Sequence, residues 1–188
     1  MNYDEFLRVK LAHVEPSGWD AVVDSPHLFA YQQDLVRWAL RRGKAAIFAS
    51  TGLGKTRMEI EWARQVALRT GGRVLVLTPL AVAAQMSAEG DDIGIPAKVC
   101  REQSDVVGPV SVTNYDRLHR FDASAFSGVV LDESSCIKHY NSKTLTMLLE
   151  AFGDTPFRLA ATATPAPNDW TELGTHAEFL GVCSREEM

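Results

Sequence analysis

The sequence predicts an α/β fold: a doubly wound, mostly parallel sheet with helices on its faces. Short apolar runs, typical of strands buried on both faces, recur at residues 45–49, 74–78, 110–113, 129–131 and 157–161. Helical patterns lie between or after these runs, at residues 55–69, 80–89, 142–151 and 170–180. Strands that alternate with helices in this way are typical of a parallel α/β sheet.

Two more helices are expected before the first strand. Residues 3–11 carry apolar side chains at spacings of three and four, and residues 15–18 end this helix. Ser25 followed by Pro26 is typical of an N-cap and a first helical position. The apolar face that follows predicts a second helix, which should end at 41–43.

The sequence contains one composition regime and no internal repeat, which favours one main domain. We expect residues 1–24 to form an N-terminal helix and linker, and residues 25–188 to form the main lobe. Within this lobe, Asn141 and Asn168 precede the last two predicted helices and are suitable N-caps.

The composition excludes several protein classes. With 46% hydrophobic and 23% charged residues, the 188-residue chain can bury a core and does not resemble a disordered protein. Its uninterrupted apolar runs reach five residues, whereas a membrane-spanning helix needs about 20. The net charge of −5 argues against a surface that is basic all over, but it is compatible with a local basic groove.

The cysteines and the N-terminus favour the cytoplasm. Cys100, Cys136 and Cys183 are odd in number and far apart, which suits a reducing compartment better than a disulfide framework. The first residues are acidic and show no secretory signal pattern. A metal site at Cys136 and His139 is disfavoured because the chain has no paired cysteine motif.

A glycine-rich segment, Ala-Ser-Thr-Gly-Leu-Gly-Lys-Thr at 49–56, joins a predicted strand to a predicted helix. A phosphate-binding loop (Walker A) requires this context, because its glycines let backbone N–H groups turn toward phosphates at a helix N-terminus. Lys55 would reach the β and γ phosphates, and the hydroxyl of Thr56 would bind Mg²⁺. The predicted ATP-binding residues of the loop are Thr51, Gly52, Leu53, Gly54, Lys55 and Thr56. A glycine-rich turn with a surface lysine is the alternative, since Ala49 stands where the pattern usually begins with glycine.

Two adjacent acids, Asp132 and Glu133, end the predicted strand at 129–131. A carboxylate at this place can hold Mg²⁺, and its neighbour can orient and deprotonate an attacking water. We therefore assign Asp132 to the metal and Glu133 to the water, with Lys55 as the third catalytic residue. Alone, such a pair could equally end a strand or cap a helix.

Other short motifs follow in order along the chain: Leu-Phe-Ala-Tyr-Gln at 28–32, Thr-Pro-Leu at 78–80, Thr-Asn-Tyr at 113–115, Ile-Lys at 137–138 and Thr-Ala-Thr-Pro at 162–165. Together with the glycine-rich loop and the acid pair, they resemble the first RecA-like lobe of superfamily 2 helicases and translocases with DEAD/DEAH-like motifs. The match is best to the Swi/Snf-type branch. The resemblance covers residues 28 to 181, and it extends to the compact helicases of phages and prophages.

The resemblance implies roles for the other motif residues. Gln32 would read the adenine edge, by the hydrogen-bond logic with which glutamine reads adenine in DNA. The coupling element would be Thr162, Ala163 and Thr164, and the nucleic-acid backbone would be faced by Thr78, Pro79, Asn114, Tyr115 and Lys138. For Thr78 and Asn114, turn formation and helix capping are the alternative.

Some positions depart from the family pattern. Ser135 stands where many of these helicases carry histidine, and Ala163 replaces a glycine. The motifs in these 188 residues match the first RecA-like lobe, so we expect the second lobe, with the arginine that completes the ATP site, to lie outside them. Because an arginine finger is worth about 10³–10⁵ in rate, we expect this chain alone to hydrolyse ATP slowly or not at all, as a fragment of a longer enzyme.

These observations predict the ATP-binding lobe of a DNA-dependent ATPase that uses ATP and Mg²⁺. Its partners would be nucleic acid, DNA in preference to RNA, and a second RecA-like lobe in the same or another chain. A non-catalytic nucleotide-binding or interaction module is the alternative. A small P-loop kinase is a third hypothesis, disfavoured by the acid pair and by the element at 162–165.

Overall fold

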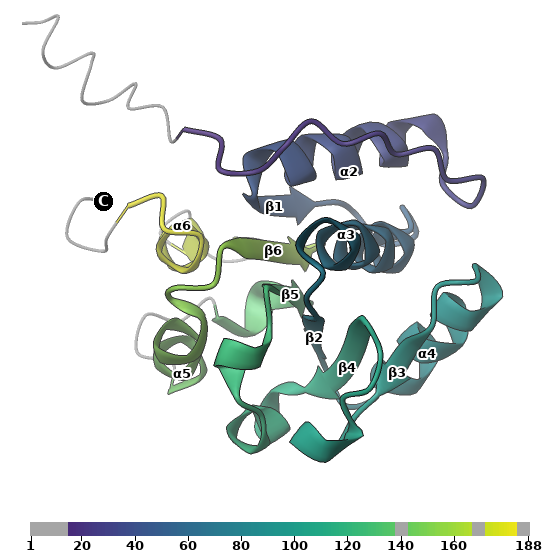
Figure 1. The fold of residues 1–188 in the computed structure, drawn as a ribbon. Coiled ribbons are helices and arrows are strands. Elements are labelled where there is room, and N and C mark those ends of the chain that lie inside the picture. The colour runs from purple at the N-terminus through teal and green to yellow at the C-terminus, as the bar shows by residue number, and fades with distance from the viewer. Residues whose placement is uncertain (1–14, 138–142, 167–171, 184–188) are drawn as a thin grey trace, which may run out of the picture.

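The computed structural model describes residues 15–137, 143–166 and 172–183. Within them, six parallel strands form one sheet in the order β1-β6-β5-β2-β4-β3 (Figure 1). The strands are β1 (Lys44–Phe48), β2 (Val74–Thr78), β3 (Ala97–Val99), β4 (Val110–Asn114), β5 (Gly128–Asp132) and β6 (Phe157–Thr162). The predicted α/β class is therefore confirmed, with a sheet that is parallel throughout.

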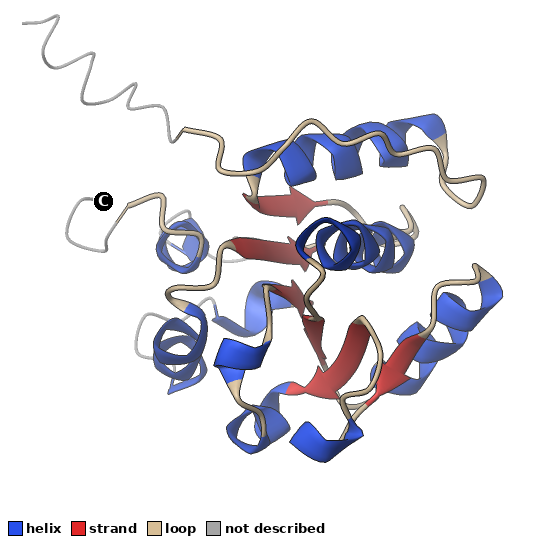
Figure 2. Cartoon of the chain, in the orientation of Figure 1, coloured by secondary structure: helices blue, strands red, loops and turns tan. Residues whose placement is uncertain are grey.

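Helices cover both faces of this sheet (Figure 2). They are α2 (Ala30–Arg42), α3 (Lys55–Thr70), α4 (Ala83–Asp92), α5 (Lys143–Phe152) and α6 (Leu173–Phe179). One apolar cluster joins α2, α3 and α4 to the sheet, and a second joins α5 and α6 to the opposite face. Along β2, Val74 and Val76 belong to the first cluster and Leu75 and Leu77 to the second, as the pleat requires.

The five strands predicted from apolar runs all form, with ends displaced by one residue at most. β3 was not predicted. It has three residues, too few to show a periodicity, and it pairs only with β4 at the edge of the sheet.

The predicted start of the second helix is wrong. Ser25 and Pro26 belong to a turn that the bond from the Leu28 N–H to the Ser25 carbonyl closes at 3.1 Å, and α2 begins at Ala30. The side chain of Gln32 caps this helix, because its Oε1 accepts the N–H of Phe29 at 2.9 Å.

The segment before α2 runs back along that helix. Backbone N–H groups of residues 17–19 donate to carbonyls of residues 40–42 at 3.2 Å. Gly18 is needed for this approach, since a Cβ there would lie 1.8 Å from the carbonyl oxygen of Leu40. The helix predicted at 3–11 and the predicted caps Asn141 and Asn168 lie outside the described residues, and the division after residue 24 stays a prediction. None of the described helices has the length and apolar character needed to span a bilayer.

Candidate functional site

The glycine-rich loop connects β1 to α3, as predicted. Gly52 and Gly54 have φ angles of 83° and 72°, in the left-handed region that favours glycine. Leu53 donates its N–H to the Ser50 carbonyl at 3.3 Å, and α3 begins at Lys55. The first N–H groups of a helix have no intrahelical partner. Backbone donors and the positive end of the helix dipole therefore meet where the loop joins the N-terminus of α3.

Lys55 extends across this loop. Its Nζ donates to the carbonyl oxygen of Ala49 at 3.1 Å, and the side chain is half-buried. The amine therefore lies over the start of the loop. Thr56 follows in the first turn of α3 and is also half-buried.

The acid pair lies at the carboxyl end of β5, in the middle of the sheet. Asp132 is buried and accepts a hydrogen bond from Thr78 Oγ1 at 2.6 Å. Burial raises the pKa of Asp132, and the Thr78 bond and the charge of Lys55 oppose this shift. Its backbone carbonyl accepts the Tyr115 hydroxyl at 2.7 Å. Thr78 on the neighbouring strand β2 thus holds the side chain of Asp132, and Tyr115, directly after β4, holds its backbone.

Glu133 has a φ of 48°, the only positive φ among the described non-glycine residues. This turn separates it from the buried strand, and its side chain is half-buried. Glu133 Oε2 lies 3.4 Å from Thr162 Oγ1, which donates to it. A backbone in this region is strained for a non-glycine residue, as is common at functional sites.

Thr162 connects three parts of the site. Besides its bond to Glu133, its Oγ1 accepts the N–H of Thr164 at 3.1 Å, and its carbonyl accepts the N–H of Ala49 at 3.2 Å. The side chain is fully buried, Ala163 is half-buried and Thr164 is exposed. The predicted coupling element therefore touches both the acid pair and the start of the glycine-rich loop.

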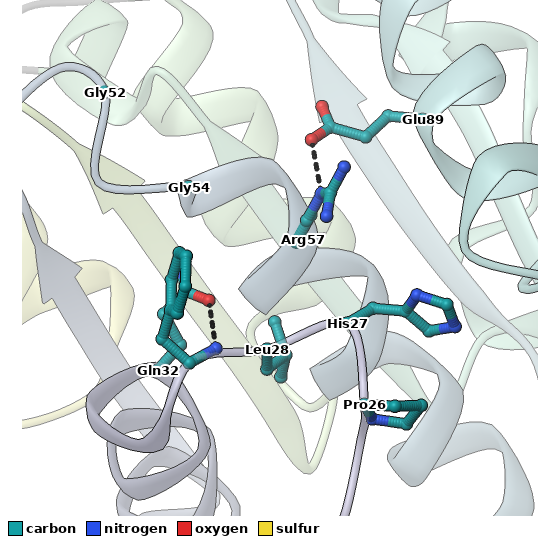
Figure 3. Close-up of a pocket in the computed structure, with 9 residues that line it drawn as sticks. Pro26, His27, Leu28, Gln32, Gly52, Gly54, Arg57 and Glu89 are labelled. Atoms are coloured by element: carbon teal, nitrogen blue, oxygen red, sulfur yellow. Dashed lines mark hydrogen bonds and ion pairs between the residues drawn. The ribbon is translucent and has the colours of Figure 1, made fainter.

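Gln32 is buried and uses its amide within the protein (Figure 3). Besides capping α2, it donates from Nε2 to the Leu53 carbonyl at 2.9 Å and to the Tyr31 hydroxyl at 3.3 Å. A Cβ on Gly54 would lie 2.4 Å from this nitrogen. The predicted adenine reader thus fixes the loop conformation in this structure.

A cleft of about 330 Å³ lies beside Gln32 and the loop glycines (Figure 3). Its other lining residues include His27, Phe29, Arg57 and Glu89. Arg57 donates to Glu89 at 3.0 Å and to Asp92 at 3.2 Å, so α4 holds its guanidinium. Phe29 is 72% exposed and its ring stacks on that of Tyr31, with centroids 6.1 Å apart.

The residues predicted to face nucleic acid have different environments. Thr78 and Asn114 are buried, Pro79 and Tyr115 are half-buried, and Lys138 lies outside the described residues. Thr78 and Tyr115 both bind Asp132, as described above. The structure therefore brings two of these residues to the acid pair.

One acid in the site was not identified from the sequence. Glu59 on α3 is fully buried, and neither carboxylate oxygen has a hydrogen-bond partner within the described residues. Burial raises the pKa of Glu59 well above its ordinary value; the charges of Asp132 and Glu133 add to this, and that of Lys55 opposes it. The spacing with Trp62, Ala63 and Val66, all buried, is the helical pattern that could have placed Glu59 inside.

His176 is a second residue near the acid pair that was not identified from the sequence. It lies on α6, which covers the face of the sheet opposite to α3. Its Nε2 is 3.0 Å from Ser134 Oγ, and its ring meets that of Phe48 edge to face at 5.4 Å. Phe48 ends β1 and Ser134 follows Glu133 directly. His176 thus connects α6 to the end of β1 and to the residue that follows the acid pair.

We expect His176 to make the fold sensitive to acid. Burial lowers its pKa from 6.5, so the unfolded chain takes up the proton before the folded chain does. Stability should therefore fall as the pH drops below about 6.5, by at most about 1.4 kcal/mol per pH unit, and His176→Gln should remove this component. Urea unfolding between pH 7.5 and 5 measures it, and equal slopes in both proteins would contradict the expectation.

The chemistry of the site fits a magnesium nucleotide. The described residues contain no group of three acidic, histidine or cysteine side chains that could hold a metal alone. Mg²⁺ at phosphate sites needs less, because it keeps several waters and binds one or two carboxylates together with the phosphates. Thr56 and Asp132 supply a hydroxyl and a carboxylate of the required kind, and Gly52 leaves open space above the loop.

The fold matches the RecA-like helicase lobe found in several solved structures. The SWI2/SNF2 ATPase core of Sulfolobus solfataricus, solved in complex with dsDNA, is 21% identical, with a TM-score of 0.68 over 88% of this chain and 37% of that one. The UvsW helicase of bacteriophage T4 is 16% identical, with a TM-score of 0.67 over 98% of this chain and 66% of that one. The Hef helicase domain of Pyrococcus furiosus is 18% identical, with a TM-score of 0.66 over 80% and 36%.

These similarities concern the fold. The chain spans between about a third and two thirds of the lengths of these proteins. No family model and no curated protein matches the sequence. The resemblance inferred from the sequence motifs is confirmed at the level of the fold. The roles of the motif residues and an origin from a phage stay predictions.

Proposed function

We propose that this chain is the ATP-binding lobe of a DNA-dependent ATPase of the helicase and translocase type. The observation that carries the proposal is the convergence of the loop lysine, the acid pair and Thr162 at the carboxyl edge of the sheet. Lys55 reaches over the loop, Thr162 contacts both the loop and Glu133, and Asp132 is held by Thr78. In open α/β sheets this edge is the usual place for a ligand.

Each residue has a part in binding Mg²⁺-ATP. The loop N–H groups and Lys55 bind the phosphates, while Thr56 and Asp132 hold Mg²⁺, which neutralises charge that develops on the transferred phosphoryl group. Glu133 orients water and accepts its proton. The cleft lined by His27, Phe29 and Gln32 takes the base, and Phe29 offers an exposed aromatic face. Gln32 positions the loop and the base pocket together.

The polymer and the second lobe complete the proposal. Duplex DNA is the polymer that we propose, because one structural neighbour was solved with dsDNA. A second RecA-like lobe would close over the nucleotide and supply an arginine to the ATP site. Thr162 links the acid pair to the start of the loop and accepts the N–H of Thr164. Together, Thr162 and Thr164 would pass the nucleotide state to that lobe.

ATP hydrolysis tests the proposal. The chain is assayed with Mg²⁺, with and without single- and double-stranded DNA, alone and fused to a second RecA-like lobe. We expect little turnover by the chain alone and DNA-stimulated turnover by the fusion. Nucleotide binding that never leads to DNA-stimulated hydrolysis would favour the non-catalytic module, and a phosphorylated small-molecule product would favour a kinase.

A further inference from the structure

Glu59 is the buried acid whose presence the fold does not explain. Both of its oxygens are buried without a hydrogen-bond donor among the described residues. Two other buried acids have such donors: Glu61 binds Arg64 and Gln65 on its own helix, and Asp132 binds Thr78. Burying a carboxyl without a partner is unfavourable by several kcal/mol. Glutamine or methionine would form the same helix turn without a buried charge.

The position of Glu59 indicates which ligand it could serve. It lies one helical turn after Lys55 and Thr56, so the three side chains share one side of α3. This helix packs on β5 and β2, whose carboxyl ends carry Asp132 and Thr78. The charges of Asp132 and Glu133 add to the rise of the Glu59 pKa, and that of Lys55 opposes it. Glu59 therefore belongs to the part of α3 that follows the loop and packs on the strands that carry Asp132 and Thr78.

A direct bond between Glu59 and the cation is not required. Mg²⁺ at phosphate sites binds one or two carboxylates together with the phosphates, and Asp132 already supplies one carboxylate. Mg²⁺ keeps several waters when it binds phosphates, and each of these waters needs a hydrogen-bond acceptor. The two oxygens of Glu59 are acceptors that no donor of the described residues uses, one helical turn from Thr56.

We propose that Glu59 is a positioning residue for the divalent cation, and that its carboxylate accepts hydrogen bonds from waters that the cation keeps while Thr56 and Asp132 hold it. The inference rests on the proposed function, since the cation arrives with the nucleotide. Such outer ligands orient the inner ones, and their loss typically weakens metal binding about 10- to 100-fold.

Mn²⁺ binding tests this inference without relying on turnover. Free Mn²⁺ is measured by electron paramagnetic resonance during titration in the presence of a non-hydrolysable ATP analogue. Glu59→Gln keeps an oxygen acceptor but loses the charge, and Glu59→Met loses both. We expect Mn²⁺ affinity to fall in the order wild type, Glu59→Gln, Glu59→Met, by about 10- to 100-fold in total.

Glu61→Gln is the matched control, because it makes the same change at a buried acid on the same helix. Glu61 is bonded to Arg64 and Gln65, so this variant should lose stability in urea and keep its Mn²⁺ affinity. The Glu59 variants should instead keep or gain stability, because they remove an unpartnered buried carboxyl. Opposite effects on stability and cation affinity separate a positioning role from a structural one.

Two results would overturn the inference. Unchanged Mn²⁺ affinity in both Glu59 variants would do so and would leave the proposed function intact. A loss of affinity that parallels a loss of stability, in the Glu59 variants and in Glu61→Gln alike, would assign Glu59 a structural role. If the wild-type chain binds neither the ATP analogue nor Mn²⁺ with it, the proposed function itself fails.

Discussion

Replacing Lys55 with alanine should abolish most of the affinity for ATP while leaving the fold intact. Among the residues that the structure describes, the amine donates to the carbonyl of Ala49, and the side chain is half-buried. With nucleotide bound, the same amine would pair with phosphate oxygens. Hydrogen bonds to charged groups contribute about 1.5–3 kcal/mol, which corresponds to about 10- to 100-fold in affinity.

Titration with a fluorescent ATP analogue in the presence of Mg²⁺ measures this loss. Lys98→Ala is the control, because Lys98 is exposed on the edge strand β3. Its affinity should equal that of the wild type, and urea unfolding should give both alanine variants nearly wild-type stability. Wild-type affinity in Lys55→Ala would remove the phosphate role of the loop, and with it the proposed function.

Much of the fold could be predicted because its information is local. The strands of the central sheet are runs of Val, Leu, Ile and Ala, and these residues indicate burial on both faces wherever they occur together. The strand order is different. β6 is the last strand in the chain, yet it lies between β1 and β5, and this position depends on pairings between distant segments. No local pattern encodes such pairings.

The residues of the candidate site could be proposed from local patterns in the same way. Lys55, Asp132 and Glu133 could be located because loop glycines and adjacent acids form short motifs at the ends of strands. The partners of these residues could not. That Thr78 donates to Asp132, or that Gln32 holds the Leu53 carbonyl, depends on which strand ends and loops become neighbours in space. A motif identifies a candidate residue but not the contacts that fix its position.

The sequence does not reveal the contacts of charged residues that lie inside predicted strands and helices. Glu59 and Arg158 both occur where the pattern predicts burial, and both are buried. Their environments differ in a way that the pattern does not reveal. Glu59 has no hydrogen-bond partner within the described residues, whereas Arg158 on β6 donates to three backbone carbonyls. Such a difference decides whether a buried charge supports the fold or a function.

Arg158→Met should therefore cause the largest loss of stability that we predict. The guanidinium donates to the carbonyls of Thr155, Gly153 and Phe179, and so holds the start of β6 and the end of α6 together. It also lies 5.8 Å from the ring centroid of Phe179. Burial lowers its pKa, but the three acceptors match the planar fork of an arginine. Removing it leaves these carbonyls without their donor, at a loss of about 3–5 kcal/mol.

Urea unfolding measures this loss as a shift of the midpoint at an unchanged slope. Arg158→Lys should be intermediate, because an ammonium group keeps the charge but cannot reproduce the fixed geometry of the guanidinium. Arg73→Met is the control, since Arg73 is exposed just before β2 and its replacement should change stability by less than about 0.5 kcal/mol. Equal midpoints for Arg158→Met and Arg73→Met would mean that the bonds of Arg158 to the three carbonyls do not hold α6 against the sheet. His176 reaches Ser134 from α6. If Arg158→Met loses stability because α6 leaves the sheet, this variant should also lose the acid sensitivity assigned to His176.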